Sequence, residues 1–253
     1  MNPIVTVIVP HHLNENQKYL DWCLDSILSS NIDLEVLVYA SSENKPSVPD
    51  DKRLTLRWDK ELYPNCTSKF HAGIKDASTS SKYMMLISDG VIVSKYCIRE
   101  LAEACGDMGA IMGPASNCDA TTRYSAVFNV WDWRGENCVI PQKCSLEDIA
   151  GFEHAVINYP VAKRILLDPG WISFYCTMFP KTVLNAVGLF NNAMDVRWND
   201  VEFCKRARAK GRPAFINLGA FALHFGDKTL PKSTKPEDYE VADEAWKQSC
   251  AYL

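Results

Sequence analysis

A single carboxylate follows a mostly apolar segment of the chain. Tyr83–Ile87 is the apolar run, and Ser88, Asp89 and Gly90 come directly after it. This pattern predicts a buried strand that presents Asp89 at its carboxyl end, the edge at which open α/β sheets bind ligands. A carboxylate there suits a divalent cation that bridges to a nucleotide diphosphate, because such cations prefer oxygen ligands. The alternative interpretation is that Asp89 only caps the following turn.

The elements that must position this carboxylate alternate in type along the first part of the chain. Strand-like segments are expected at 4–9, 34–39, 53–58, 83–87 and 110–112, and helical segments at 16–29, 68–77 and 94–105. Such alternation predicts an α/β fold in which helices flank a mixed, mostly parallel sheet. Pro10 is expected to end the first strand, and Ser94 to cap the third helix.

Periodicity weakens between residues 116 and 169, where a short helix is expected at 145–154. Regular periodicity of apolar residues resumes at Gly170. Strand-like segments are expected at 171–179, 213–218 and 220–224, and helices at 181–187, at 199–210 and from 236 onward. The last helix carries an apolar face that packs on the body or on a second copy of the chain, so a homo-oligomer is one expectation.

Composition limits the classes of protein that the sequence can encode. The chain has 253 residues, is 47% hydrophobic and 23% charged, and carries a net charge of −4, which fits a globular domain without a broad nucleic-acid footprint. No apolar run is long enough for a transmembrane helix, and no leader-like segment opens the chain, so a cytoplasmic protein is expected. None of the ten cysteines forms a C-x-x-C pair, which predicts reduced, mostly buried thiols and no cysteine zinc site.

Three separated segments occur in an order that is typical of one family. They are Val5–Pro10 with the helical Tyr19–Leu28, then Lys69–Ile74 leading into Tyr83–Gly90, then Val187–Asn191 with Asn199–Ala207. Together they resemble family 2 glycosyltransferases, members of the nucleotide-diphospho-sugar transferase superfamily with the GT-A fold. The resemblance covers about residues 4–228.

The resemblance implies a single GT-A-like, Rossmann-type domain over 1–226. About 1–113 would bind the nucleotide sugar and 114–226 the acceptor, and a loop and C-terminal helix follow over 227–253. It implies transfer of a hexose or pentose to an acceptor hydroxyl, with inversion by direct displacement. It also implies a cation, Mn²⁺ or Mg²⁺, held by Asp89 and His224, and it matches Asp200 to the general base.

The residues implied in donor binding are Pro10, His11, Ala40, Ser41, Lys69, Ser88 and Asp89. Those implied in acceptor binding are Trp131, Trp133, Trp171 and Asn199.

Plainer interpretations exist for several of these side chains. The alternative for Lys69 is an exposed helix lysine, that for the tandem histidines at the first strand end is solvation, and that for His224 is a strand-end residue satisfied by hydrogen bonds. Asp200 is equally well a first-turn acid that compensates the helix dipole, in a helix capped by Asn199. In that case Glu202 is the next candidate base.

The sequence also departs from the family pattern. Ser88-Asp89-Gly90 stands where the family has Asp-x-Asp, Asn199-Asp200 stands where it has Glu-Asp, and no carboxylate follows the second strand before Glu43. Two other functions therefore stay open. One is a catalytically silent module that binds a sugar nucleotide or a glycan, and the other is a glycosyltransferase acting on a modified nucleic-acid base.

Overall fold

The computed structural model describes residues 4–12, 17–116, 129–131, 137–139, 166–194 and 198–225, and, near the C-terminus, 240–241, 243–245 and 247–248. The helix expected at 145–154 lies outside the described residues. Within the interval of weak periodicity, a short antiparallel pair is described, formed by β7 (Asn129–Trp131) and β8 (Asn137–Val139).

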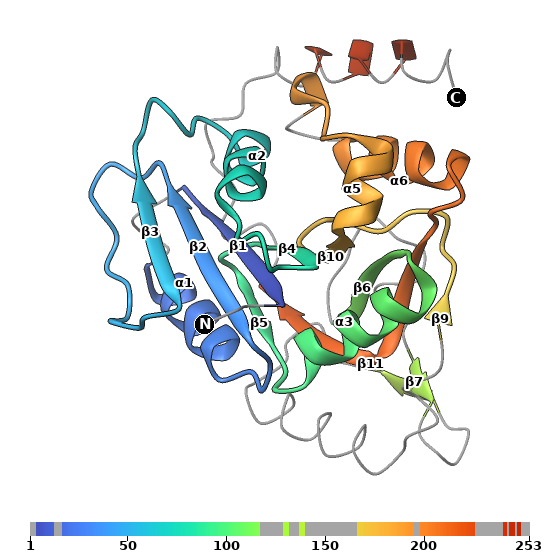
Figure 1. Ribbon diagram of the computed structural model, residues 1–253, viewed down its shortest axis with the longest axis horizontal. Helices are drawn as coiled ribbons and strands as arrows, with labels where there is room; N and C mark the ends of the chain where they lie inside the picture. Colours follow the sequence, from blue (N-terminus) through green and yellow to red (C-terminus); the bar gives the residue numbers. More distant parts are fainter. Residues whose placement is uncertain are drawn as a thin grey trace.

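One mixed sheet forms the centre of the molecule (Figure 1). Its strands are β1 (Val5–His11), β2 (Leu34–Ala40), β3 (Leu54–Trp58), β4 (Tyr83–Ile87), β5 (Val91–Val93), β6 (Ile111–Ser116), β9 (Leu166–Leu167), β10 (Cys176–Pro180) and β11 (Ala214–His224). Their order is β3-β2-β1-β4-β10-β6-β11-β5, with β9 beside β11. Strands β1 to β4 pair in parallel, whereas β10 runs antiparallel between β4 and β6. The expected α/β class with a mixed sheet is confirmed.

Helices cover both faces of this sheet (Figure 1). One side carries α1 (Gln17–Leu28) and α3 (Cys97–Met108), and is called the α1 face. The other carries α2 (Cys66–Asp76), α5 (Lys181–Val187) and α6 (Asn199–Ala209), and is called the α2 face. A short 3₁₀ helix, Asn192–Met194, precedes α6.

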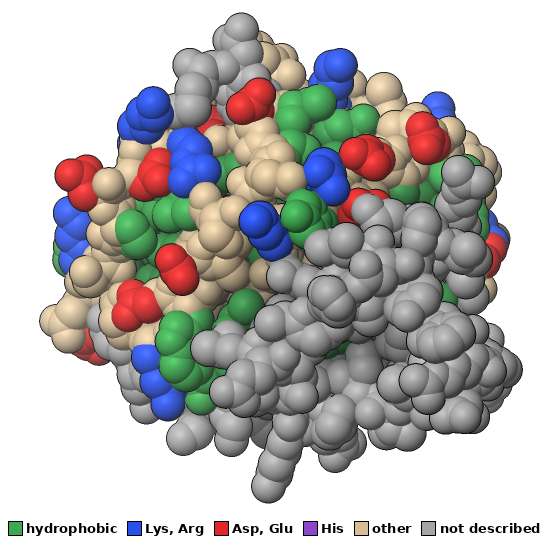
Figure 2. Space-filling view, turned by 90° about the horizontal axis from the view of Figure 1, so that it is seen from below, with side chains coloured by type: hydrophobic (Ala, Val, Ile, Leu, Met, Phe, Trp, Pro, Cys, Tyr) green, Lys and Arg blue, Asp and Glu red, His purple; other side chains and the backbone are tan. Residues whose placement is uncertain are grey.

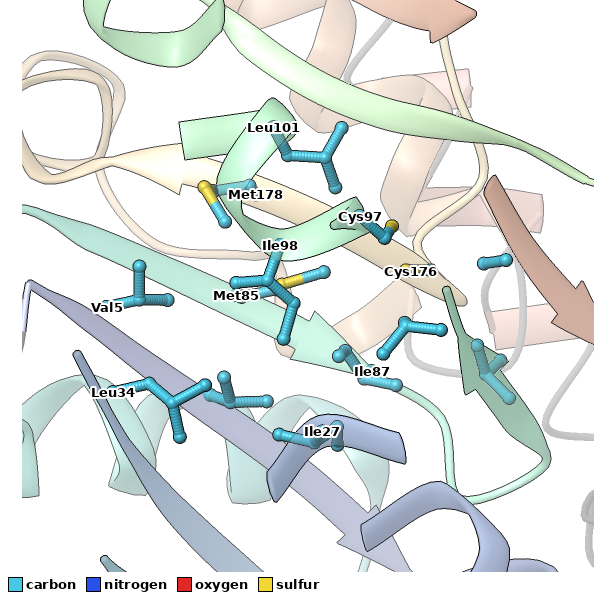
Figure 3. Close-up of a cluster of buried hydrophobic side chains, with 14 of the residues drawn as sticks. Val5, Ile27, Leu34, Met85, Ile87, Cys97, Ile98, Leu101, Cys176 and Met178 are labelled. Atoms are coloured by element: carbon cyan, nitrogen blue, oxygen red, sulfur yellow. The ribbon is translucent and has the colours of Figure 1, made fainter. Parts of the chain in front are cut away.

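The alternation of side chains along β1 assigns its residues to the two faces. Val5, Val7 and Val9 belong to the buried cluster that includes side chains of α1 and α3. Figure 3 shows part of this cluster, with side chains from α1, α3 and the sheet between them. Ile8 instead belongs to the cluster of α2, α5 and α6. The same alternation decides where the two histidines at the end of β1 point.

Helix α2 lies unusually close to β1. A Cβ atom at Gly73 would come within 2.6 Å of the Ile8 side chain, so only glycine permits this approach. Asn65 caps the helix in a capping box with Ser68, where each side chain accepts a hydrogen bond from the backbone N–H of the other residue. The cap and the close contact together fix the first turn of α2 beside the end of β1.

Two strand boundaries differ from expectation. Pro10 does not end β1, because Pro10 and His11 still pair with β2 after the pairing with β4 has stopped at Ile8. One edge of β1 is open at that point, and such an edge tolerates a residue without an N–H. The two strands expected at 213–224 are the single strand β11, which is interrupted by an irregularity between Asn217 and Phe221.

Two helix starts also differ. Helix α3 begins after Tyr96 and has no side-chain cap, so Ser94 is not its N-cap. Helix α6 begins after Trp198, whose φ of 71° makes it the one non-glycine residue with positive φ in the described chain. Asn199 is therefore the first residue of α6 and not its cap.

Candidate active site

The predicted donor-binding residues lie at the carboxyl ends of adjacent parallel strands. β1 lies between β2 and β4 in the order β3-β2-β1-β4, so the strand order reverses at β1. Ligands bind at this kind of topological switch point. His11 ends β1 and His12 follows it, Ser41 follows β2, and Ser88 follows β4. The structure thus brings these predicted residues to one edge of the sheet.

A buried ammonium group lies on the α2 face of this edge. Lys69, in the first turn of α2, has 0% exposure, so the exposed-lysine interpretation is wrong. Its Nζ donates a hydrogen bond to Ser41 Oγ at 2.7 Å and lies 2.7 Å from His12 Nδ1. The three side chains come from α2, β2 and β1, so Lys69 joins the elements that form the edge.

Burial and the Lys69 charge keep the His12 ring neutral. They lower the pKa of His12 to about 3, and the neighbouring His11 adds to the effect. A neutral imidazole accepts a hydrogen bond from the ammonium, which accounts for the short contact. The alternative interpretation of solvated tandem histidines is wrong, because His11 is fully buried and His12 is mostly covered. Alternation along β1 places them on opposite faces of the sheet.

We expect acid to destabilise the protein through His12. Between pH 6.5 and the lowered pKa, the unfolded chain binds a proton at this residue that the folded chain does not, so unfolding becomes easier as the pH falls. From pH 7 to pH 5 this amounts to up to about 2 kcal/mol for one such group. Urea unfolding at both pH values should show a smaller loss of stability in His12→Gln than in wild type. An equal loss in both proteins would contradict the assignment.

The Asp89 carboxylate points to the opposite, α1 face. Its Oδ2 lies 2.6 Å from His11 Nδ1, and the two side chains are 4% and 0% exposed. Cys23 of α1 lies close enough that the Asp89 charge, together with burial, raises the pKa of its thiol. The apolar run of β4 therefore does end in Asp89, but that carboxylate is directed into the protein.

His224 ends β11, as the sequence predicted, and lies near the same turn. The N–H of the following residue, Phe225, bonds the Gly90 carbonyl at 3.0 Å. The His224 ring stacks on Tyr175, with centroids 4.6 Å apart and planes 5° from parallel. The strand-end interpretation thus describes its position, while its predicted role in metal binding stays a prediction.

The described side chains do not form the cation site implied by the resemblance. No group of three His, Cys, Asp or Glu residues with metal-binding geometry occurs in the described part of the chain. Asp89 is engaged by His11. Besides His224, a further candidate is His11 Nε2, a buried nitrogen without a hydrogen-bond partner among the described residues. One such nitrogen does not supply the oxygen-rich shell that Mn²⁺ and Mg²⁺ prefer.

The predicted base lies at the start of α6, on the α2 face. The Asp200 carboxylate accepts hydrogen bonds from the Val201 N–H at 2.8 Å and from Ser173 Oγ at 3.3 Å. The positive end of the helix dipole favours its ionised form. Asn199 Nδ2 donates to Thr67 Oγ1 at 2.8 Å, which joins the first turn of α6 to the first turn of α2. Lys69 and Asp200 thus lie on two helix starts that bond directly to each other.

An aromatic cluster holds these two helices in place. Phe70 of α2 stacks on Phe190, with ring centroids 4.6 Å apart, and Phe190 meets Phe203 of α6 edge-on at 4.9 Å. Phe70 directly follows Lys69, and Phe203 lies three residues after Asp200. Packing of rigid rings therefore fixes the positions of both charged groups.

Glu202, the second candidate base, is engaged in a different role. Its carboxylate is 5% exposed and is bound by both Nε and Nη2 of Arg206, at 2.5 and 2.9 Å. Arg206 also donates to the carbonyls of Val187 and Leu189. These contacts tie α6 to the end of α5, so Glu202 is a structural residue.

The predicted acceptor-binding residues are only partly described. Trp171 is half-buried against the core of the α2 face, two residues before Ser173. Trp131 ends β7, and nothing is described of its side chain, while Trp133 lies outside the described residues. Asn199 lies beside Asp200, as predicted, with its amide bonded to Thr67.

Sequence reasoning missed three residues of this region. Thr67 and Ser173 carry no signal that distinguishes them from other hydroxyl residues. Trp198 donates its indole N–H to Asp243 at 2.6 Å, which joins the head of α6 to the C-terminal segment. This segment is helical where it is described and lies beside α5 and α6 in Figure 1.

The cysteines behave as expected. Six cysteines have a described side chain; all six are free thiols, and five of them are buried. Burial raises the pKa of the Cys204 thiol to about 12, so this group stays protonated. None of the buried thiols is suited to nucleophilic chemistry.

The fold is similar to that of two solved glycosyltransferases. GalNAc-T7 with UDP, GalNAc and Mn²⁺ aligns over 88% of this chain and 44% of its own, with a TM-score of 0.61 and 10% identity. The mannosyltransferase PcManGT from Pyrobaculum calidifontis, in complex with GDP-Man and Mn²⁺, aligns over 98% of this chain and 61% of its own, with a TM-score of 0.56 and 14% identity. The chain therefore has the GT-A fold and spans only part of the length of either protein.

Comparisons based on sequence alone found no match. No protein-family model matches the chain, and no curated protein matches it either. Among the described residues, no helix has the length and apolar character that crossing a bilayer requires.

Proposed function

We propose that this protein is a glycosyltransferase that moves a sugar from a nucleotide-diphosphate sugar to an acceptor hydroxyl. The observation that carries the proposal is the Asn199–Thr67 hydrogen bond, which holds the helix start of Asp200 against that of Lys69. A transferase needs a group that neutralises the donor's negative charge and a base that takes the acceptor's proton. Both groups must act from the same side of the sheet. The GT-A fold of the two neighbours, both glycosyltransferases, supports this choice.

In the proposed reaction Asp200 takes the proton of the acceptor hydroxyl as that oxygen attacks the anomeric carbon. The bond to the diphosphate breaks in the same step, so the configuration at that carbon inverts. Ser173 and the Val201 N–H orient the carboxylate through their hydrogen bonds. The nucleoside diphosphate leaves with the electron pair of the broken bond, and its diphosphate needs positive charge near the carboxyl ends of β1 and β2.

The sequence predicted Mn²⁺ or Mg²⁺ for this neutralisation, and the two neighbours are both complexed with Mn²⁺. A bound cation would act as a Lewis acid on the diphosphate. Since the described residues do not form its site, no step is assigned to it. The donor and acceptor halves, the cytoplasmic location and the homo-oligomer likewise remain predictions.

The test is a turnover assay with UDP-GalNAc and GDP-mannose as donors, each with and without a mixture of saccharide acceptors. We expect one donor to release its nucleoside diphosphate faster when acceptor is present. The donor should also stabilise the fold, by about 2.7 kcal/mol at a hundredfold its dissociation constant. If neither donor stabilises the protein or is turned over, the assignment is wrong for these two donor classes.

The same assay separates the second candidate function, a silent sugar-nucleotide-binding module. This candidate is favoured by one observation, the buried bond between Asp89 and His11, which withdraws the predicted cation ligand from the donor edge. A silent module would be stabilised by a donor without releasing nucleotide.

Transfer to a nucleic-acid base finds less support. On the face shown in Figure 2, basic and acidic side chains are interspersed on the described surface and do not form a broad basic patch. A gel-shift at low salt should therefore show no binding of duplex DNA or RNA.

A further inference from the structure

The charged groups at the donor edge are sorted between the two faces of the sheet. Asp89 and His11 form a closed pair on the α1 face, next to Cys23. Lys69 lies on the α2 face, the side that also carries Asp200 through the bond between α2 and α6. Hence the positive charge that lies on the same face as the predicted base, Asp200, is the ammonium group of Lys69.

Lys69 is placed as a ligand-binding ammonium would be. Among the residues that the structure describes, it is the only lysine or arginine that is buried. Ser41 and His12, both uncharged, accept hydrogen bonds from its ammonium and orient it. Long charged side chains are rarely buried without a functional or ionic reason.

An anionic oxygen is a stronger acceptor for this ammonium than a neutral ring. A bond from an ammonium to a neutral ring is already charge-assisted, but an anionic oxygen adds the Coulomb attraction of opposite charges, which low solvent access strengthens. The His12 ring lies against Nζ with both nitrogens within 3.2 Å, so it occupies the place that such an oxygen would take.

We propose that Lys69 binds the diphosphate of the donor, with a phosphate oxygen replacing the His12 ring on its ammonium, and that it neutralises the leaving group in place of a cation held by Asp89. This inference rests on the proposed function. It assigns Asp89 the task of fixing His11 inside the α1 face, and it makes nucleotide binding independent of divalent metal.

The experiment measures binding of UDP and GDP by isothermal titration calorimetry, in EDTA and in Mn²⁺, with wild type, Lys69→Met, Lys75→Met and Asp89→Asn. Uridine and guanosine, which have no phosphate, are titrated alongside. Lys75 is the matched control, because it is an exposed lysine in the last turn of the same helix. A melting curve of each variant reports whether it is folded.

We expect wild type to bind one of the two nucleotides with the same affinity in EDTA and in Mn²⁺. Lys69→Met should weaken that binding by about 10- to 100-fold, the worth of a hydrogen bond between charged groups. It should leave binding of the matching nucleoside unchanged. Lys75→Met should bind as wild type, and folded Asp89→Asn should keep its nucleotide affinity in EDTA.

Two results would overturn the inference while leaving the proposed function standing. One is nucleotide binding that requires Mn²⁺ and is lost in Asp89→Asn. The other is an equal loss of nucleotide and nucleoside binding in Lys69→Met, which would make Lys69 a structural residue that joins α2 to the strand ends. If neither nucleotide binds under any condition, the result contradicts both the proposed function and this inference.

Discussion

Replacing Asp200 by asparagine should slow sugar transfer by a factor on the order of 10² to 10⁴, the usual contribution of a general base. The substitution keeps the size of the side chain and the oxygen that accepts the Val201 N–H, but it removes the site that takes the proton. Turnover of the donor identified in the assay above, with saturating acceptor, is the measurement.

The fold and the donor site should be little affected by this change. Loss of one charge at a helix start costs about 0.3–1 kcal/mol, so the melting temperature should fall only slightly. Affinity for the nucleotide should stay as in wild type, because Lys69 is intact. Asp25→Asn, the same chemical change at an exposed position of α1, is the matched control and should transfer sugar at the wild-type rate.

Wild-type transfer by Asp200→Asn would show that Asp200 is only a first-turn acid. A fall in transfer that is matched by a fall in nucleotide affinity would show that the substitution disturbs the donor edge instead of the proton transfer.

The parts of the fold that the sequence predicted are those fixed by local pattern. The run Tyr83–Ile87 is a strand because apolar residues fill both of its faces, and α5 ends at Gly188 because that position has a φ of 90°. Such signals lie within one element and need no knowledge of its neighbours. This is why the strand ends that carry the site could be named in advance.

The direction of the polar side chains depended on contacts between elements. Asp89 was expected at the donor edge, but its orientation follows from His11, which is 78 residues away in the chain. Lys69 was expected either to bind the donor or to be an exposed lysine, and the choice depended on His12 and Ser41, which follow other strands and bury its ammonium. Asn199 was expected to cap its helix, since its bond to Thr67 joins residues 132 positions apart and cannot be read from the local sequence. Pairings of this kind leave no periodic trace in a single sequence.

Truncating Glu202 to alanine should lower the free energy of unfolding by about 3 kcal/mol. Removing one partner of a buried ion pair costs about 3–5 kcal/mol, and the lower end applies because the Arg206 side chain is 24% exposed. For a chain of this size we expect the melting temperature to fall by about 6–12 °C, measured by differential scanning calorimetry. The cause is local, since Arg206 would keep its bonds to Val187 and Leu189 but lose its only buried carboxylate among the described residues.

Glu103→Ala is the matched control for this change, because Glu103 forms an exposed ion pair with Arg99, also four residues apart on a helix. That variant should lose less than about 1 kcal/mol, as surface pairs do. Well below its melting temperature, Glu202→Ala should transfer sugar at a rate close to wild type per folded molecule, since its carboxylate faces Arg206 and not the acceptor. An unchanged melting temperature together with a large loss of transfer would reverse the assignment, and would make Glu202 the base and Asp200 the helix-start residue.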